Sequence, residues 1–569
     1  MRAMKRLVRC IAVTSLIVSL SACGIQSSEI TQKISATETA DKSQSQDTTV
    51  QVSAKGELPI ASEPIELDVV VKSNPQISDY ENNLLINYME EKTGIKANYI
   101  VIPADDITQK INLMLSSGQD MPDIFISCLT SDLISTYSEK NMFVPINDYL
   151  ETQSAYFEPL LEEREHARES LTLPDGRIVG IPYFLPVGEK VEQAEHSAIG
   201  GKMWINQTWL DNLGLEMPTT TDEFKEVLQA FKEKDPNGNG KMDEIPLIGA
   251  TKGGWDSLPE IFLSNAFLPY DNDNMYYIDD NGKVQASYAQ DEYREALIYL
   301  NSLSEAGLLD SSTYTQDNAQ LKQLVEKEEG IVGCFPSTAS SMAVTPGTDR
   351  FKEYVALPPL KGPEGVQLTK TRIWSIGTGS YSAITSACEN PEAAFKWLDY
   401  WYSEDISIRN KYGVEGVHWQ KPAEGTIGLN GEAAKIEILI DLYSGDPNNV
   451  RAGHNLGCPD KFMNYVARSE DEYEPERVFA EASQLYFPYA PAEKNYMKSY
   501  FYNVEDAKRM SEVNATLVTY IDEARTKFIL GIRDIHNDDD WNDYMKEIEK
   551  IGYQTILDIM QNRVDIARK

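Results

Sequence analysis

Ile65-Glu-Leu-Asp-Val-Val-Val71 opens a stretch in which strand-like and helix-like segments alternate. Two further strand-like runs follow it, Ala97-Asn-Tyr-Ile-Val-Ile102 and Asp123-Ile-Phe-Ile126. Between the runs, residues 80–92 and 105–117 carry apolar side chains at helical spacing, and a glycine follows each of these segments. Strands that alternate with helices form parallel βαβ units. We therefore expect an α/β fold with an open sheet that helices cover on both faces.

Further along, the pattern changes to hairpins and then to helices. Asp175-Gly176 and Asn281-Gly282 are turn dipeptides between strand-like flanks, and each predicts a hairpin. The carboxyl-terminal third is mainly helical, with helices expected over residues 505–530 and 540–568. The chain is thus predicted to add a helical carboxyl-terminal part to an α/β body.

Composition and charge narrow the classes of partner. The chain has 569 residues, of which 41% are hydrophobic and 25% charged, as in soluble globular proteins. Its formal net charge is −37. A surface this acidic repels phosphate backbones and anionic headgroups, so we expect no nucleic-acid partner. Calcium or a neutral ligand fits the charge better.

The amino terminus has the form of a secretory signal. Four basic residues lie within the first nine, and a mostly apolar run over 10–20 follows them. Leu20-Ser-Ala-Cys23 then places small residues before a cysteine and resembles the lipobox of bacterial lipoproteins. This resemblance implies that residues 1–22 are cleaved and that Cys23 carries a diacylglycerol. The alternative is an ordinary signal with a coincidental cysteine.

Residues 23–63 follow as the lipidated cysteine and a flexible tether. The segment is rich in Ser, Thr, Gln and Ala, and it has few large apolar residues. No later apolar run approaches the ~20 residues that span a bilayer. We therefore expect a protein held at the extracellular face of the cell membrane by its lipid anchor alone. The remaining cysteines show no C-x-x-C spacing, which favours buried thiols while leaving one disulfide open.

The strongest chemical signal is Asp235-Pro-Asn-Gly-Asn-Gly-Lys-Met-Asp-Glu-Ile-Pro246. Calcium takes six to eight oxygen ligands, which an EF-hand loop supplies at alternate positions around a glycine turn. Position twelve of this loop is Pro246 and not the usual bidentate glutamate, so the ligand shell must close earlier. The oxygen donors that the loop offers are those of Asp235, Asn237, Asn239, the Lys241 carbonyl, Asp243 and Glu244. The loop predicts a structural Ca²⁺ site, with a plain Asn/Gly-rich surface turn as the alternative.

Catalytic signatures are absent from the sequence. It has no G-x-S-x-G, H-E-x-x-H or Walker-type motif, and its five histidines are isolated from one another. Carboxylate pairs of the kind that hydrolyse glycosides stay open among the 89 acids, because their separation is a three-dimensional property. We expect a protein that is not an enzyme.

Three tryptophans stand beside glycines in loop-like sequence and are candidate sugar platforms: Trp255, Trp374 and Trp419. A flat ring stacks on the C–H face of a sugar while neighbouring polar groups bind its hydroxyls. Arg372 is a weaker candidate for ligand contact, and a bound uronate would call for Arg372 or Arg451. The alternative for each tryptophan is packing at the base of a loop.

Several motifs, in this order, make the chain similar to a known family. They include Leu173-Pro-Asp-Gly-Arg-Ile-Val-Gly-Ile-Pro182, Trp204-Ile-Asn-Gln-Thr-Trp-Leu-Asp-Asn-Leu-Gly-Leu215, the Asp235 loop, Tyr299-Leu-Asn-Ser-Leu-Ser-Glu-Ala-Gly-Leu308 and Asp540-Trp-Asn-Asp-Tyr544. The chain resembles the extracellular solute-binding proteins of bacterial ABC transporters, in the branch of calcium-containing alginate-binding proteins and LipO lipoproteins. The family's calcium ligands map onto the six loop residues named above.

The resemblance implies a two-lobed periplasmic-binding-protein-like fold of type II, in the large oligosaccharide-binding branch. One lobe would hold residues 64–185 with 330–400, and the other residues 186–329 with 401–569. It further implies a monomer that captures an oligosaccharide between the lobes and delivers it to ABC permease subunits. The rival functions are a cell-surface glycan hydrolase or lyase and a peptide or signal receptor.

Overall fold

The chain is described here from a computed structural model. It covers residues 51–74, 77–163, 167–183, 198–253, 256–273, 275–373, 375, 380–440, 449–454 and 456–568. The predicted signal, Cys23 and most of the tether lie outside these residues, as do Trp255 and Trp374. No helix within the described ranges is both long and apolar enough to cross a membrane.

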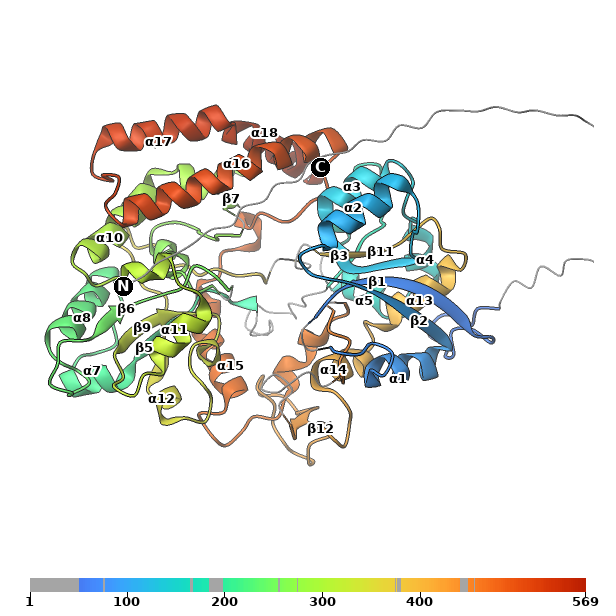
Figure 1. Cartoon of the computed structure of the whole chain (residues 1–569), viewed down its shortest axis with the longest axis horizontal. Helices are drawn as coiled ribbons and strands as arrows, with labels where there is room; N and C mark the ends of the chain where they lie inside the picture. The colour runs from blue at the N-terminus through green and yellow to red at the C-terminus, as the bar shows by residue number, and fades with distance from the viewer. Residues whose placement is uncertain are drawn as a thin grey trace, which may run out of the picture. The chain divides into compact units, whose positions relative to one another are not determined.

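The first sheet is built on the stretch that begins at Ile65 (Figure 1). Its strand order is β2-β1-β3-β11-β4, with β1 Ile65–Lys72, β2 Ile95–Ile102, β3 Ile124–Leu129, β4 Ile181–Pro182 and β11 Tyr381–Ile384. β1 pairs in parallel with both β2 and β3, as the alternation predicts. β11 runs antiparallel to β3 and β4, so the sheet as a whole is mixed.

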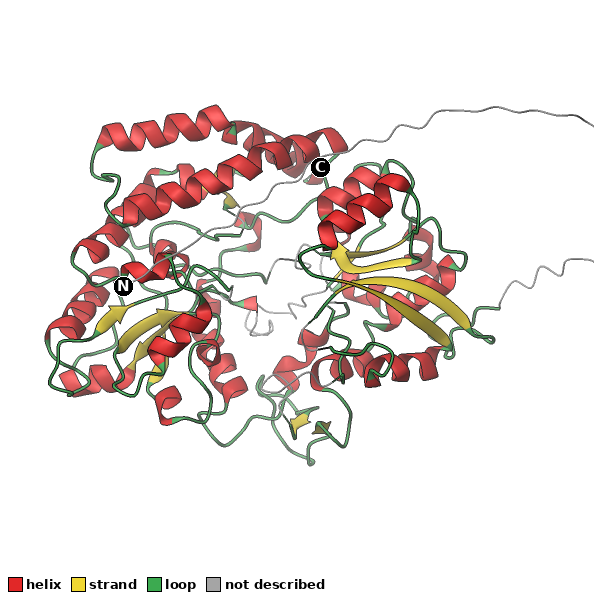
Figure 2. Ribbon diagram, in the orientation of Figure 1, coloured by secondary structure: helices red, strands yellow, loops and turns green. Residues whose placement is uncertain are grey.

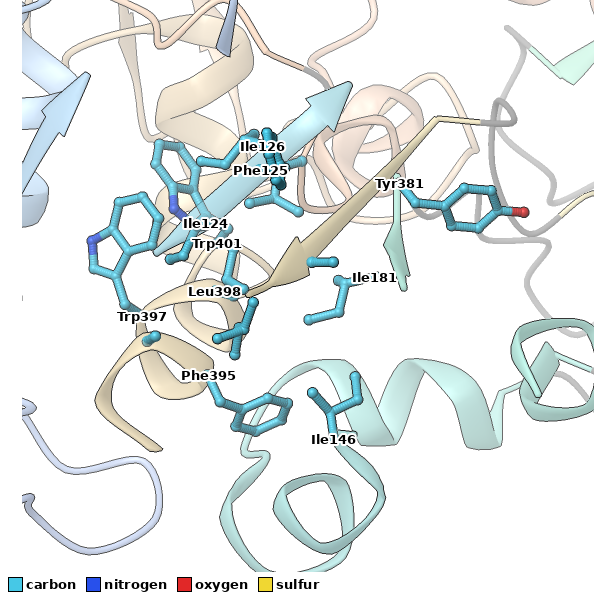
Figure 3. Close-up of a cluster of buried hydrophobic side chains, with 14 of the residues drawn as sticks. Ile124, Phe125, Ile126, Ile146, Ile181, Tyr381, Phe395, Trp397, Leu398 and Trp401 are labelled. Carbon is cyan, nitrogen blue, oxygen red and sulfur yellow. The ribbon is translucent and has the colours of Figure 1, made fainter. Parts of the chain in front are cut away.

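Helices cover both faces of this sheet (Figure 2). Successive strand residues point to opposite faces, and Ile124, Phe125 and Ile126 are all at most 1% exposed. Figure 3 shows these three side chains together with Leu398, which lies in α13 (Pro391–Tyr400), and Trp401, which directly follows that helix. The predicted helices α1 (Leu84–Thr93) and α2 (Ile107–Ser117) end at glycines with φ of 69° and 65°.

The second sheet has the order β10-β5-β9-β6. Its strands are β5 Met203–Asn206, β6 Ile245–Leu247, β9 Val332–Pro336 and β10 Tyr354–Leu357. β6 and β9 pair in parallel, whereas β5 runs antiparallel to both β9 and β10. This pairing differs from the predicted assignment of residues 330–400 to the first lobe. After β6 the chain crosses over and returns as β9, which pairs beside β6, so β9 and β10 belong to the second sheet. Of the strands within residues 330–400, only β11 belongs to the first sheet.

The remaining helices divide between the two cores. Those that pack on the first core are α3 Ser131–Ser138, α4 Asn147–Gln153, α5 Phe157–Glu162, α6 Ala167–Leu171 and α14 Glu404–Tyr412. Those around the second sheet are α7 Gln207–Leu213, α8 Thr221–Glu233, α9 Pro259–Leu263, α10 Asp291–Glu305, α11 Asn318–Val325, α12 Asp349–Lys352 and α15 Pro475–Tyr486. Residues beyond 400 therefore contribute to both cores.

The carboxyl-terminal helices pack on one another and on the second core (Figure 1). They are α16 Val504–Ile529, α17 Asp538–Ile551 and α18 Tyr553–Ala567. The single helix predicted over 540–568 is wrong, because Gly552 adopts a φ of 113° and ends α17. Left-handed backbone at that position stops the helix and lets α18 start in a new direction.

Of the two predicted hairpins, the one at Asn281-Gly282 forms, whereas at Asp175-Gly176 only the turn forms, because its two flanks do not pair with each other as strands in the described residues. β7 (Tyr276–Ile278) and β8 (Val284–Ala286) pair antiparallel around Asn281-Gly282. At Asp175-Gly176 the chain turns so that the Leu173 amide donates to the Arg177 carbonyl at 2.8 Å. A short pair, β12 (Trp419–Gln420) with β13 (Glu437–Ile438), packs with residues of α14 in a small buried cluster of its own. In the described part of the chain, Cys128, Cys334, Cys388 and Cys458 are free thiols, as favoured from their spacing.

Candidate ligand site and calcium loop

Two connections between the sheets lie side by side. The chain leaves the first sheet after β4 and enters the second at β5, and it returns from β10 to β11. Ile199 on the first connection and Thr371 on the second form an antiparallel bridge. The Arg372 amide also donates to the Ala198 carbonyl at 2.7 Å. This pairing places residues 198–201 and 369–373 together where the chain passes from one sheet to the other.

A buried lysine gathers three carboxylates at this junction. The Nζ of Lys370 lies 2.8 Å from Oδ1 of Asp256, 3.1 Å from Oδ1 of Asp271 and 2.7 Å from Oδ2 of Asp273. It also donates to Oδ1 of Asn272 at 2.8 Å. The Lys370 side chain is 0% exposed. A buried ammonium needs such partners, because an unpaired charge away from water is strongly disfavoured.

Asp256 links this lysine to the first connection. The Gly201 amide donates to its Oδ2 at 3.2 Å. A Cβ atom at Gly200 would lie 2.1 Å from the same oxygen, so the close approach requires a glycine there. Asp256 thereby holds both connections at once, through its two carboxylate oxygens.

The charges of this cluster stabilise one another. Burial opposes the charge of Lys370, but Asp271, Asp256 and Asp273 together raise the pKa of its ammonium above the usual range. Burial alone would raise the pKa of Asp256, but Lys370 and Arg372 hold it below its usual value. Burial raises the pKa of Asp271 more than the attraction of Lys370 lowers it. The deeper part of the cluster is therefore an ion-paired network.

Arg372 forms the accessible edge of the same cluster. Its side chain is 44% exposed, and its Nη2 lies 3.9 Å from Oδ2 of Asp256 and 3.8 Å from Oδ2 of Asp273. These separations exceed hydrogen-bond length, so attraction holds the guanidinium near the acids while its N–H groups stay available. The Asp273 side chain is 61% exposed. We name Lys370, Asp256, Asp271, Asp273 and Arg372 the Lys370 cluster.

Of the four predicted ligand residues, the structure describes two, Arg372 and Trp419. Arg372 lies in the Lys370 cluster. Trp255 and Trp374 fall outside the described residues, although Asp256 directly follows Trp255 and Arg372 precedes Trp374 by two positions. Trp419 is only 5% exposed, and its indole N–H donates to the Gly413 carbonyl at 2.9 Å. Trp419 thus takes the packing role that the sequence left as the alternative to a sugar platform.

The other members of the cluster are not evident from the sequence. Lys370 and Asp256 are 114 residues apart, and isolated acids and lysines are common in a chain this charged. The one sequence feature that could have indicated Lys370 and Asp256 is that each lies close to a predicted ligand tryptophan. An acid next to Trp255 and two basic residues just before Trp374 suggest opposite charges on segments that meet.

The predicted calcium loop joins α8 to β6. The Asp235 carboxylate accepts from the amides of Asn239 at 3.1 Å and Gly240 at 3.0 Å, so it turns into the loop. Oδ1 of Asn237 accepts from the Asn239 amide, and Oδ1 of Asn239 accepts from the Lys241 amide. Gly238 and Gly240 have φ of 68° and 77°, which the tight turn requires. The alternate side-chain oxygens are therefore held on the inner side of a turn.

Glu244 is the feature of this loop that calls for a cation. Both of its carboxylate oxygens are inaccessible to solvent and have no hydrogen-bond partner within the described residues. Burial raises the pKa of Glu244, and the nearby carboxylates of Asp235 and Asp243 raise it further. Oxygen-only donors around unpaired carboxylates suit Ca²⁺. In the described part of the chain no three acidic, His or Cys side chains are drawn together as a metal cluster, so the carboxylates of the loop do not converge on one point.

Comparisons with known proteins agree with this architecture. Residues 74–407 match the family model of the bacterial extracellular solute-binding proteins. The chain is 29% identical over 494 residues to the fructooligosaccharide ABC transporter substrate-binding protein FusA of Streptococcus pneumoniae, covering 86% of this chain and 87% of FusA. It is 23% identical over 475 residues to the polygalacturonan/rhamnogalacturonan-binding protein YtcQ of Bacillus subtilis, covering 82% of this chain and 84% of YtcQ.

Solved structures give the same result for the fold. The S. pneumoniae FusA structure in complex with kestose superposes with a TM-score of 0.69 at 26% identity, covering 88% of this chain and 99% of that one. An HMO-binding, ABC-transporter-associated solute-binding protein of Bifidobacterium longum infantis superposes with a TM-score of 0.72 at 21% identity, covering 89% of this chain and 100% of that one. The predicted two-lobed α/β fold is confirmed. This chain belongs to the bacterial extracellular solute-binding proteins, as its motifs predict.

Proposed function

We propose that this protein captures an oligosaccharide outside the cell and delivers it to the permease of an ABC importer. The observation that carries the proposal is the similarity to FusA, an oligosaccharide-binding protein, over 86% of this chain. The Lys370 cluster supports it, because Arg372 and Asp273 present a donor and an acceptor beside the paired connections. A ligand that touches both lobes would favour their closed arrangement by population shift.

A thermal-shift panel tests this function. The secreted mature chain is heated with neutral oligosaccharides, acidic oligosaccharides and peptides, all with calcium present. A ligand at about 100 times its Kd adds about 2.7 kcal/mol to the free energy of unfolding and raises the melting temperature. Stabilisation by an oligosaccharide that is recovered intact supports the proposal. Stabilisation by peptides alone, or the appearance of cleaved sugars, supports one of the rival functions.

The proposal includes a lipid anchor at Cys23 and a structural calcium ion in the Asp235 loop. The basic and apolar residues before Cys23 support the anchor. For calcium the support is Glu244 with its unpartnered oxygens, together with a solved FusA structure described as an EF-hand mutant. When bound, the ion would neutralise the loop acids and tie α8 to β6. Exchange of Cys23 for alanine should move the protein from the membrane fraction to the medium.

A further inference from the structure

The accessible edge of the Lys370 cluster presents one donor group and one acceptor group side by side. Arg372 Nη2 lies 3.8 Å from Oδ2 of Asp273, and the two side chains are 44% and 61% exposed. The buried Nζ of Lys370 holds Asp273 in place through a contact of 2.7 Å with its Oδ2. A guanidinium donates to a sugar hydroxyl oxygen, while a carboxylate accepts from a neighbouring hydroxyl. Two adjacent hydroxyls would satisfy both groups.

The charge of the cluster decides which sugars it favours. Lys370 and Arg372 supply two positive charges against the carboxylates of Asp256, Asp271 and Asp273, which leaves one excess negative charge. A uronate that approached Arg372 would also face Asp256 and Asp273, each within 3.9 Å of that guanidinium. Like charges at such distances repel. Arg451, the other basic residue considered for a uronate, is buried at 6% exposure.

We infer that the Arg372–Asp273 pair recognises adjacent hydroxyls of an uncharged oligosaccharide and disfavours sugars that carry carboxylates. The inference rests on the proposed oligosaccharide-binding function and narrows its ligand to one chemical class. It separates this chain from a binder of acidic pectin, a class represented among its relatives by YtcQ. Lys370 acts as a positioning residue, because its ammonium orients Asp256, Asp271 and Asp273 and is itself buried.

Calorimetric titration of the mature protein tests the inference. The probes are kestose and nystose as neutral sugars, and trigalacturonate with its methyl ester, which keeps the backbone and removes the charge. The variants are Arg372→Met, Arg372→Lys and Asp273→Asn. Asp349→Asn is the matched control, because Asp349 is fully exposed and lies outside the cluster.

The expected result is tighter binding of a neutral probe than of trigalacturonate. Arg372→Met should weaken the neutral probe about ten- to one hundred-fold, as for a hydrogen bond to a charged group, and Arg372→Lys should weaken it less. Asp273→Asn should narrow the preference for the neutral probe over trigalacturonate by about fivefold. Asp349→Asn should change neither affinity.

Other results would overturn either the preference for uncharged sugars alone or the proposed oligosaccharide binding as a whole. Tighter binding of trigalacturonate, or neutral binding that all three cluster variants retain, overturns the inference and leaves oligosaccharide capture standing. Failure of the wild-type protein to bind any neutral or acidic oligosaccharide in a wider panel removes the proposed function, and the inference with it.

Discussion

The Nζ of Lys370 lies 2.8 Å from Oδ1 of Asp256, and the two side chains are 0% and 5% exposed. The pair joins segments that are 114 residues apart in the chain. Because Asp256 also accepts from the Gly201 amide, the ion pair fastens both connections between the sheets. The position of Arg372, two residues beyond the lysine, depends on this pair.

Lys370→Met tests how much this ion pair contributes to the free energy of unfolding. Removal of the lysine leaves Asp256, Asp271 and Asp273 without their shared cation, and breaking a buried pair costs about 3–5 kcal/mol. We expect the free energy of unfolding, measured in urea, to fall by about that amount. Lys352→Met is the control, since Lys352 is 45% exposed and pairs with a fully exposed acid. Equal stability of the two variants would show that the cluster does not hold the connections.

Calcium removal should lower the melting temperature of the wild-type protein. Calcium at about 100 times its Kd would add about 2.7 kcal/mol to the free energy of unfolding, and EDTA would remove it. Glu244→Gln should abolish this response and the bound metal measured by mass spectrometry. Met242→Ala, at an exposed position of the same loop, should keep both. A Glu244→Gln protein with wild-type metal content would contradict the site.

His454 should make the protein less stable in acid. Burial lowers its pKa to about 3 from the ordinary value of 6.5, and neither ring nitrogen has a hydrogen-bond partner within the described residues. As the pH falls from about 6.5 to 3, the unfolded chain binds a proton that the folded chain does not bind. The free energy of unfolding therefore falls by up to about 1.4 kcal/mol per pH unit from this residue alone.

His454→Phe checks this expectation. Phenylalanine keeps a ring against Trp401, whose centroid lies 4.5 Å from that of the imidazole. Urea unfolding of the variant between pH 4 and 7 should show a shallower loss of stability than that of the wild type. The exposed His536→Phe serves as the control. Parallel curves for His454→Phe and the wild type would mean that the buried imidazole does not contribute.

Trp419→Phe distinguishes core packing from a role in ligand binding. Trp419 packs with Ile408, Tyr412 and Phe462 in a small buried cluster. We expect the variant to lose about 1–3 kcal/mol of stability, because the Gly413 carbonyl loses its donor, while the Kd for the ligand stays the same. Loss of ligand affinity at unchanged stability would instead restore the platform role.

Sequence reasoning succeeded where the signal was local. The first three strands and their helices follow from apolar spacing within residues 65–126. The calcium site in the contiguous loop from Asp235 to Glu244 stays a prediction. The break at Gly552 was missed, because apolar spacing continues on both sides of the glycine and only its φ of 113° shows the stop. Short strands such as β4, with two residues, carry too little pattern to be assigned to a sheet.

The candidate ligand site could not be predicted from local sequence patterns. Lys370 meets Asp256 and Asp273 only because the chain crosses between the sheets twice and the crossings pair at Ile199 and Thr371. Neither the strand order of the second sheet nor this pairing is encoded in any single segment. The burial of Trp419 was equally unforeseeable, since a glycine-flanked tryptophan has the same local pattern whether it packs inward or stays exposed.

Capture of an oligosaccharide for transport is tested by calorimetric titration of the mature chain with intact oligosaccharides, followed by mass analysis of the recovered sugar. We expect saturable binding of a neutral oligosaccharide, one per chain, with the sugar recovered unchanged. Absence of binding across neutral and acidic oligosaccharides, or recovery of shortened products, would contradict capture for transport.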